Sequence, residues 1–301
     1  MEAISRENSF NLQVGVALAS ILVTGGAGFI GTKLCERLHI EGHHVISLDL
    51  NHNIEQPWEC LTADIRDELV LEGIDCIVHL AAQVSVSQSI VNPEETLSIN
   101  VDGTSSIISA AEESGVKRIL FASSAAVYGD SDEVPTSESA PLIPQSPYAV
   151  SKIVGEELLR RTSVETCAMR FFNVYSANQK SDGAYAAVIP AFKNSIKIGK
   201  PCTIYGDGTQ VRDFIHRDDL VSIITQLITV KNPPSEVNIA TGKGTSLLAL
   251  IELLDETFDT KTEIIFENER EGDIHTSIAD ISKLRSMISD FSFTDFKEGL
   301  K

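Results

Sequence analysis

Residues 23–31 read Val-Thr-Gly-Gly-Ala-Gly-Phe-Ile-Gly and decide the fold of this chain. An apolar, β-branched run at 21–24 leads into the glycines, as in a buried parallel strand, and residues 29–40 have helical periodicity. Glycines at a strand-to-helix turn allow unusual φ angles and let the backbone approach a pyrophosphate, which the helix N-terminus attracts. The pattern therefore predicts a dinucleotide site formed by Gly25, Gly28, Phe29, Ile30 and Gly31.

A carboxylate follows where a dinucleotide site needs one. Residues 45–49 are predicted to form the second strand, and Asp49 ends it. In that place a carboxylate binds a ribose 2′-hydroxyl and repels a 2′-phosphate, which favours NAD over NADP. The alternative is that Asp49 is an ordinary loop acid.

Three polar side chains predict chemistry on this cofactor. Ser124 lies just past a strand predicted at 118–123, at the edge where parallel sheets bind ligands. Tyr148 and Lys152 are four residues apart on one face of a helix predicted at 147–162. A phenol has a pKa near ~10, and a neighbouring ammonium and a nicotinamide cation would both lower it, so that Tyr148 becomes a general base. The alternative is that Tyr148 packs and Lys152 is a solvated charge.

The order of elements predicts the fold class. Strands alternate with helices in the first half of the chain, which implies a parallel sheet with right-handed crossovers. We expect an α/β fold: a Rossmann-type doubly wound parallel sheet with a smaller C-terminal α/β substrate lobe. Strands are expected near 20–24, 45–49, 59–63, 75–81 and 118–123, and helices near 29–40, 66–72, 95–114 and 147–162. The expected division is an NAD-binding domain at 18–173, to which about 212–240 returns, and a lobe at 174–301.

Composition argues against several classes of protein. The net charge of −19 disfavours nucleic acid as a partner, because like charges repel. Five cysteines are scattered without C-x-x-C spacing, so we expect neither a metal site nor a disulfide framework, and a cytoplasmic location. The apolar run at 14–23 is short for a membrane span and leads straight into the first strand, so no membrane anchor is expected.

The motifs together resemble the extended short-chain dehydrogenases/reductases and, among them, the UDP-sugar 4-epimerases. The resemblance extends from about residue 21 to about residue 300, and so many ordered matches are more specific than any one of them. The matching segments are 24–31, 63–65, 79–82, 100–104, 123–129, 170–175, 205–208 and 212–216, together with Tyr148 and Lys152.

The resemblance implies a fuller set of binding residues. For NAD, it adds Asn51, Asp64, Ile65, Leu80, Ala81, Ala82, Asn100, Ser123, Tyr148, Lys152 and Phe172. For a UDP-sugar, it implies Ser85, Ser124, Asn173, Ala187, Val188, Arg212, Arg270, Asp273 and Ser277. Arginine suits a diphosphate because its guanidinium group binds two oxygens at once. The alternatives are that Arg212 is a surface ion-pair partner and that Asp273 caps a helix. The resemblance also implies a homodimer, formed through the helices near 95–114 and 147–162.

The reaction expected from this resemblance is epimerisation at C4 of the sugar. Tyr148 would take the 4-hydroxyl proton as hydride passes to NAD, Ser124 would hydrogen-bond the same oxygen, and Lys152 would bind the nicotinamide ribose. The 4-keto sugar would turn over and receive the hydride on its other face. Related dehydratases and decarboxylases carry acidic residues after the strand-end serine, where this chain has Ala125 and Ala126. A dehydratase or decarboxylase, and a non-catalytic NAD-binding protein, are the alternatives.

Ser277 predicts which sugars fit. It matches the position where hexose-specific epimerases have a bulky tyrosine and N-acetylhexosamine epimerases a small residue. A serine leaves room for an acetamido group, so we expect UDP-GlcNAc and UDP-GalNAc to interconvert alongside UDP-Glc and UDP-Gal. The alternative is that Ser277 is small for local packing only.

Overall fold

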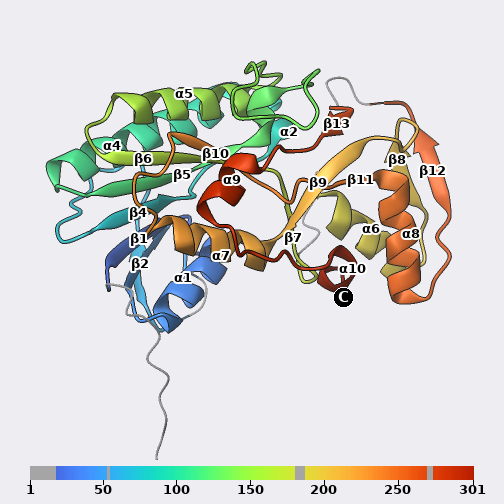
Figure 1. Ribbon diagram of the computed structural model, residues 1–301, viewed down its shortest axis with the longest axis horizontal. Helices are drawn as coiled ribbons and strands as arrows, with labels where there is room; N and C mark the ends of the chain where they lie inside the picture. The colour runs from blue at the N-terminus through green and yellow to red at the C-terminus, as the bar shows by residue number, and fades with distance from the viewer. Residues whose placement is uncertain (1–17, 53–54, 180–186, 270–273) are drawn as a thin grey trace, which may run out of the picture.

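The computed structural model of the chain describes residues 18–52, 55–179, 187–269 and 274–301 (Figure 1). In this described part, seven parallel strands form a sheet in the order β10-β6-β5-β4-β1-β2-β3. Their alternation with helices confirms the predicted fold class. The strands are β1 (Ser20–Thr24), β2 (His44–Asp49), β3 (Glu59–Thr62), β4 (Cys76–His79), β5 (Arg118–Ser124), β6 (Glu165–Phe171) and β10 (Glu236–Ile239).

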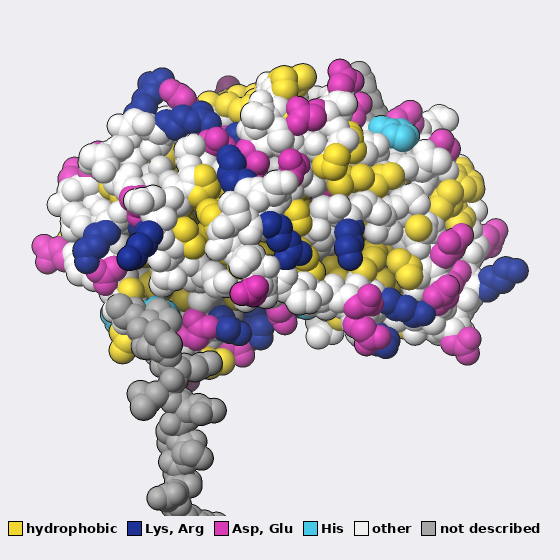
Figure 2. All heavy atoms as spheres, in the orientation of Figure 1, with side chains coloured by type: hydrophobic (Ala, Val, Ile, Leu, Met, Phe, Trp, Pro, Cys, Tyr) yellow, Lys and Arg dark blue, Asp and Glu magenta, His cyan; other side chains and the backbone are white. Residues whose placement is uncertain are grey.

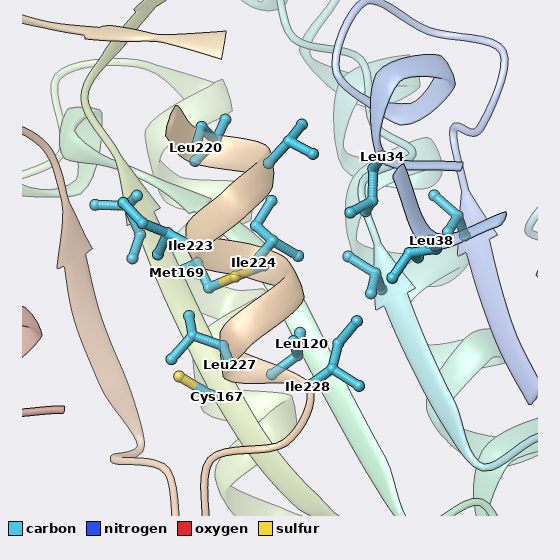
Figure 3. Close-up of a cluster of buried hydrophobic side chains, with 14 of the residues drawn as sticks. Leu34, Leu38, Leu120, Cys167, Met169, Leu220, Ile223, Ile224, Leu227 and Ile228 are labelled. Atoms are coloured by element: carbon cyan, nitrogen blue, oxygen red, sulfur yellow. The ribbon is translucent and has the colours of Figure 1, made fainter. Parts of the chain in front are cut away.

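Helices cover both faces of this sheet. Helices α1 (Gly31–Ile40) and α7 (Arg217–Leu227) pack on one face, and α4 (Gly103–Glu113) and α5 (Pro147–Arg161) lie on the other (Figure 1). The central strands β1, β4 and β5 are nearly continuous buried runs because both of their faces are covered, whereas the edge strand β3 is exposed. On the first face, the aliphatic side chains of α1 and α7 meet those of β5 and β6 in one buried cluster (Figure 3).

The chain changes direction across the sheet between β1 and β4, which are neighbours although β2 and β3 separate them in sequence. The loops that leave the carboxyl ends of these two strands therefore diverge. In an open parallel sheet, such a divergence opens a crevice in which ligands bind. The glycine-rich turn follows β1, so the sheet places it at this crevice.

A second lobe is built around β9 (Val211–His216). This strand pairs with β7 (Asn173–Tyr175), β11 (Gly244–Ser246) and β13 (Thr276–Ser277), which come from distant parts of the sequence. Beside them lie a two-stranded sheet and three helices of the described chain. These are β8 (Cys202–Tyr205), β12 (Ile264–Glu267), α6 (Val188–Lys197), α8 (Leu247–Phe258) and α10 (Phe296–Gly299). Helix α9 (Ser282–Met287) packs against β10 of the larger sheet. The chain returns to the larger sheet with α7 and β10, whereas β9 stays in the lobe.

Two predicted helices differ from the structure. Residues 66–72 are not helical, because Asp64 and Asp67 bind nearby backbone N–H groups with their side chains and so compete with helical bonds. The helix predicted at 95–114 is divided into α3 (Pro93–Leu97), a π-helical turn η1 (Ser98–Asp102) and α4, after a short helix α2 (Val86–Val91). Asn100 lies in the π turn, where its side chain is used in the site described below.

Candidate active site

The glycine-rich turn is shaped by the lack of side chains. A Cβ atom on Gly31 would lie 2.1 Å from the carbonyl oxygen of Gly25, so only glycine allows the helix to start this close to the strand. Gly25 has φ +68°, and its N–H donates to the Leu48 carbonyl at 2.8 Å. The turn therefore lies against β2 and presents the start of α1 to the crevice, as a dinucleotide requires.

A cavity of about 740 Å³ runs from this turn to the end of β5. Its lining includes nearly all the residues predicted to bind NAD. These are Gly25, Gly28, Phe29, Ile30, Gly31, Asp49, Asp64, Ile65, Leu80, Ala81, Ala82, Ser123, Tyr148, Lys152 and Phe172. Asn51 is exposed and does not line the cavity, whereas the preceding Leu50 does.

Two carboxylates stand at the glycine-rich end of this cavity. Asp49 accepts hydrogen bonds from the backbone N–H groups of Ala27 and Leu50, so its carboxylate is held beside the turn. Asp64 is bound in a fork by Arg66, with Nε at 3.0 Å and Nη2 at 2.6 Å, and this pairing lowers the pKa of Asp64. Both groups are thus suited to meet an adenosine as anions.

The three predicted catalytic side chains meet at the other end. Ser124 ends β5, and Tyr148 and Lys152 lie on the first turns of α5, whose N-terminus Ser146 caps. The Ser124 side chain lies close enough to the Tyr148 phenol to lower the pKa of that phenol. The Lys152 ammonium is 3 % exposed and lies 5.7 Å from the centre of the Tyr148 ring and 4.9 Å from that of Phe121. The structure therefore brings the predicted group together at one wall of the cavity.

In the protein alone, burial favours the neutral forms of these groups. Burial raises the pKa of the Tyr148 phenol, and the nearby Ser124 side chain opposes part of that rise. Burial lowers the pKa of Lys152 to about 7. We expected Lys152 to lower the phenol pKa, whereas here the loss of hydration is the larger effect. We also expected a nicotinamide cation to lower the phenol pKa. When bound, it would act against the effect of burial.

Asn100 acts one layer behind the cavity. Its side-chain oxygen accepts from the Gln83 N–H at 2.7 Å, and its amide donates to the Gln83 carbonyl and to Ser151 Oγ. Ser151 in turn donates to the Tyr148 carbonyl. Asn100 does not line the cavity itself. It joins the loop after β4 to the helix that carries Tyr148, so it holds two walls of the cavity in place.

A second cavity, of about 420 Å³, lies in the lobe. Four of the predicted sugar-nucleotide residues line it: Asn173, Ala187, Val188 and Arg212. The Asn173 amide donates to the Asp213 carbonyl, and the Arg212 guanidinium donates to the carbonyls of Val211 and His275. The two cavities share the lining residues Val174 and Gln179, so they are neighbours.

The remaining predicted substrate residues stand apart. Ser85 caps α2 and does not line either cavity. Ser277 pairs with Arg212 across the β13–β9 register, which puts both side chains on the same face of that sheet. Arg270 and Asp273 lie outside the described residues.

Two residues of the site were not predicted. Gln179 borders both cavities, and its buried Oε1 has no hydrogen-bond partner among the described residues. A buried acceptor without a partner is rare enough to suggest a ligand, but no sequence pattern marks it. His79 bridges Thr24 and Thr104 with its two ring nitrogens, and burial lowers its pKa to about 3, so it is neutral. Its place at the end of an apolar strand was the available signal.

The described residues hold neither a metal-binding cluster nor a helix that could span a membrane. Within residues 18–301, apart from the stretches that the structure does not describe, no cluster of His, Cys, Asp or Glu could hold a metal ion. The helices of the described residues include none with the length and hydropathy needed to cross a bilayer. On the face drawn in Figure 2, Lys and Arg side chains are scattered among acidic and neutral ones.

A dinucleotide cavity that ends at serine, tyrosine and lysine side chains is the arrangement of an extended short-chain dehydrogenase/reductase, the class expected from the motifs. The profile described as NAD dependent epimerase/dehydratase family matches residues 21–240, well over half of the chain. The chain belongs to this family, and its cofactor is NAD. The predicted resemblance and the predicted cofactor are thereby confirmed.

Individual relatives agree with this assignment. A putative UDP-glucose 4-epimerase from Methanocaldococcus jannaschii is 36% identical, over 93% of this chain and 96% of its own length. The solved UDP-glucose 4-epimerase from Thermotoga maritima with UDP-glucose superposes with a TM-score of 0.88 at 30% identity, over 94% of this chain and 96% of that one. The UDP-N-acetylglucosamine 4-epimerase from Methanobrevibacter ruminantium, in complex with UDP-N-acetylmuramic acid, gives 0.87 at 31% identity and the same coverage.

Proposed function

We propose that this protein interconverts UDP-sugars that differ in configuration at C4, by NAD-dependent oxidation and re-reduction of that carbon. One observation carries the proposal. Among the described residues that line the two cavities, the carboxylates are Asp49 and Asp64, both at the glycine-rich end. The reactive end therefore offers a phenol, a hydroxyl and an ammonium, and no carboxylate. This set suits a reaction that needs one proton acceptor and one hydride acceptor.

The chemical roles follow from the geometry. NAD, held by the lining of the larger cavity, would supply the acceptor and donor of the hydride at C4. The Tyr148 phenolate takes the proton of the 4-hydroxyl, and the Ser124 hydroxyl donates to the same oxygen as it becomes a carbonyl. The Lys152 amine lies 5.7 Å from the centre of the Tyr148 ring, where its protonated form would favour the phenolate and would bind the cofactor's ribose. In the second half-reaction Tyr148 returns the proton to the same oxygen. One side chain therefore serves both half-reactions.

The lobe would hold the UDP part of the substrate. The smaller cavity offers the Arg212 guanidinium and the Asn173 amide, with the apolar Ala187 and Val188 opposite. These are groups that suit a diphosphate and the face of a base, respectively. Gln179 lies between the two cavities, where it would bond the sugar that joins them. We assign residues 18–173 with α7 and β10 to NAD, and the rest of 174–301, including Arg270 and Asp273, to the sugar nucleotide, with Ser85 at its sugar end.

A dehydratase is the second candidate, because the family includes both activities. Elimination of water needs an additional acid or base near the sugar. The two residues after Ser124 are alanines in a short 3-10 turn, η2 (Ala125–Tyr128), and the Ser124 hydroxyl accepts from the Ala126 N–H. The place where such an acid would stand therefore carries only methyl groups, and epimerisation is favoured.

The assembly and location that we propose rest on the surface and on the cysteines. Helix α5 packs against α2, α3 and α4, and these helices expose large apolar side chains, of which Val91 is 74 % exposed and Val150 39 %. A two-fold dimer would cover them, as isologous interfaces commonly do. All five cysteines are free thiols, as expected in a reducing cytoplasm.

The test is direct. Purified protein is incubated separately with UDP-Glc, UDP-GlcNAc and UDP-GlcA, and the products are followed by proton NMR and by mass. We expect the first two substrates to give the ring-proton signals of their C4 epimers, with H4 equatorial, and no change in mass. A product lighter by water or by carbon dioxide would replace the proposal with elimination or decarboxylation. Release of NADP rather than NAD on denaturation would contradict the role of Asp49.

A further inference from the structure

A buried ion pair lies directly behind the catalytic helix. The Glu156 carboxylate on α5 accepts from Arg170 Nε at 2.9 Å and from Arg170 Nη2 at 2.7 Å, and both side chains are at most 2 % exposed. The same carboxylate accepts a short bond of 2.5 Å from the Ser123 hydroxyl. Glu156 therefore joins α5 to β5 through Ser123 and to β6 through Arg170.

The three residues surround the reacting groups. Glu156 is one helical turn beyond Lys152 and two beyond Tyr148, so all three share one face of α5. Ser123 precedes Ser124 on β5, and its Cα partner across the sheet is Arg170. The contact between Ser123 and Glu156 thus fixes how far along β5 the helix lies. That position decides whether the Tyr148 phenol meets the Ser124 hydroxyl.

Close packing makes this position sensitive. A Cβ on Gly155 would lie 2.6 Å from Phe121 Cζ, so the helix approaches β5 as closely as the backbone permits. The same Phe121 ring lies under the Lys152 ammonium. Contact with a flat ring limits the distance between helix and strand but leaves sliding and rotation unconstrained. A directed hydrogen bond from Ser123 to Glu156 supplies that constraint.

Stability alone gives little reason for an ion pair here. Removing two charges from water offsets most of their attraction, and apolar pairs of similar volume are often as stable. Arg170 is further fixed by the Tyr128 hydroxyl and the Glu138 carbonyl, and Arg160 lies 3.6 Å from Glu156. The carboxylate is therefore held from several sides, which an apolar side chain would not be.

We propose that Glu156 is a positioning residue for the reaction, which holds α5 in register with β5 so that the Tyr148 phenol and the Ser124 hydroxyl stay aligned. Arg170 fixes the carboxylate, and the Ser123 hydroxyl transmits its position to the strand end. This role rests on the proposed epimerase function, because alignment matters only where these groups react together.

The first arm of the test removes one bond only. Ser123→Ala cuts the link between Glu156 and β5 and leaves the ion pair intact. Because Ser123 also lines the cofactor cavity, the assay is run with saturating NAD, and we expect kcat for UDP-Glc to fall about tenfold to a hundredfold, as small misplacements do, with KM for the sugar nucleotide unchanged. Thr257→Val is the matched control, because it removes a hydroxyl bond within α8, far from the site. It should leave kcat unchanged.

The second arm separates positioning from folding. Glu156→Gln alone leaves the Arg170 charge without its carboxylate partner, so it should lower Tm. This single variant measures what the ion pair contributes to stability. The double variant Glu156→Leu with Arg170→Met fills the same space without charges and should fold and retain NAD. We expect it to lose kcat as Ser123→Ala does. A double variant with the turnover of the wild type would overturn the proposal.

A readout independent of turnover completes the experiment. The Tyr148 phenol is titrated by ultraviolet difference absorbance between each protein and its Tyr148→Phe counterpart. Loss of alignment moves the Ser124 side chain away from the phenol, whose pKa it lowers, so that pKa should rise in Ser123→Ala and in the double variant. An unchanged titration in both variants would refute the positioning role. If the wild type epimerises no UDP-sugar, the proposed function fails, while this titration still reports the alignment.

Discussion

In the larger sheet, most residues that line the dinucleotide cavity lie at or just after the carboxyl ends of β1 to β6, whereas the cavity of the lobe is lined from β7, α6, β8 and β9. Neighbouring parallel strands end at the same edge, so the first arrangement follows from the order of strands. In the lobe, β9 is joined to segments that start at residues 173, 244 and 276. Its arrangement depends on contacts between residues far apart in the chain.

The two regions also use buried charge differently. At the catalytic helix, burial acts on the reacting groups themselves and lowers the pKa of Lys152 to about 7. In the lobe, the fully buried Asp213 accepts from Thr241, Gly242 and Ala279, which lie in the segments that pair or pack with β9. In the first region, the buried group is the reacting Lys152, whose charged form burial destabilises. In the second, the buried Asp213 holds together the segments around β9. Four substitutions test this contrast.

The largest effect is expected from Tyr148→Phe. The substitution removes the oxygen that takes the proton and keeps the ring, so the packing of α5 is preserved. General-base catalysis alone contributes about 10² to 10⁴ in rate, and turnover should fall by at least that factor. Bound NAD and the thermal unfolding temperature should be unchanged. Turnover near that of the wild type would show that the proton leaves by another route.

Lys152→Met removes the ammonium group whose charged form burial destabilises. The folded-state pKa of about 7 lies below the ordinary value of 10.5, so between these values the unfolded chain binds a proton that the folded protein does not. The free energy of unfolding of the wild type should therefore rise as the pH increases from about 7 to about 10.5. Below about 7 the penalty is complete, on the order of 4 kcal/mol.

The variant should lack this pH dependence and, below pH 7, should be more stable than the wild type while inactive. Urea unfolding of the NAD-free proteins from pH 6 to pH 10 measures the difference. Lys117→Met, at a side chain that is 78 % exposed, is the control and should differ from the wild type by less than about 0.5 kcal/mol. Parallel curves for Lys152→Met and the wild type would show that Lys152 is not stored in the neutral form.

Much of the larger sheet could be predicted because its signals are local. The glycine turn, the run ending at Asp49 and the Tyr148/Lys152 spacing each lie within a few residues of sequence, and the cavity includes all of them. The helix expected at 66–72 failed because the side chains of Asp64 and Asp67 bind the backbone more favourably than a helix would.

The features that could not be predicted depend on contacts between residues that are far apart in sequence. The pKa of Lys152 depends on its burial by strands and loops that are distant in sequence. The spacing of the motifs does not predict how those segments pack. Gln179 reaches both cavities only because β7 leads it between two domains. The π turn at Asn100 follows from bonds to Gln83 and Ser151, whose distance in sequence from Asn100 hides the contact.

Asp213→Asn tests the assembly of the lobe. An amide can accept on one side only, so at least one of the N–H donors would face another donor. The loss should be about 1–3 kcal/mol of stability, together with a raised KM for the UDP-sugar and unchanged NAD content. Asp255→Asn is the matched control, because Asp255 accepts from Thr260 and Thr262 at the far end of α8. It should lower Tm without changing KM. Equal changes in KM would show that β9 is not specially required.

The smallest expected effect, and the most selective, concerns Ser277. Its Cα partner is Arg212, which lines the smaller cavity, so a larger side chain at 277 would extend along the same face of the sheet. Ser277→Tyr should reduce kcat/KM for the UDP-GlcNAc/UDP-GalNAc pair by about tenfold or more and leave the UDP-Glc/UDP-Gal pair within a factor of a few, because a ring overlaps an acetamido group but not a hydroxyl. Thr276→Tyr, on the opposite face, is the matched control and should not discriminate between the pairs. Proton NMR of both pairs with each variant gives the ratio directly. If both pairs lose activity together, the ring disturbs β9 as a whole. If neither changes, the acetamido group lies elsewhere, and the neighbouring Gln179 becomes the residue to examine.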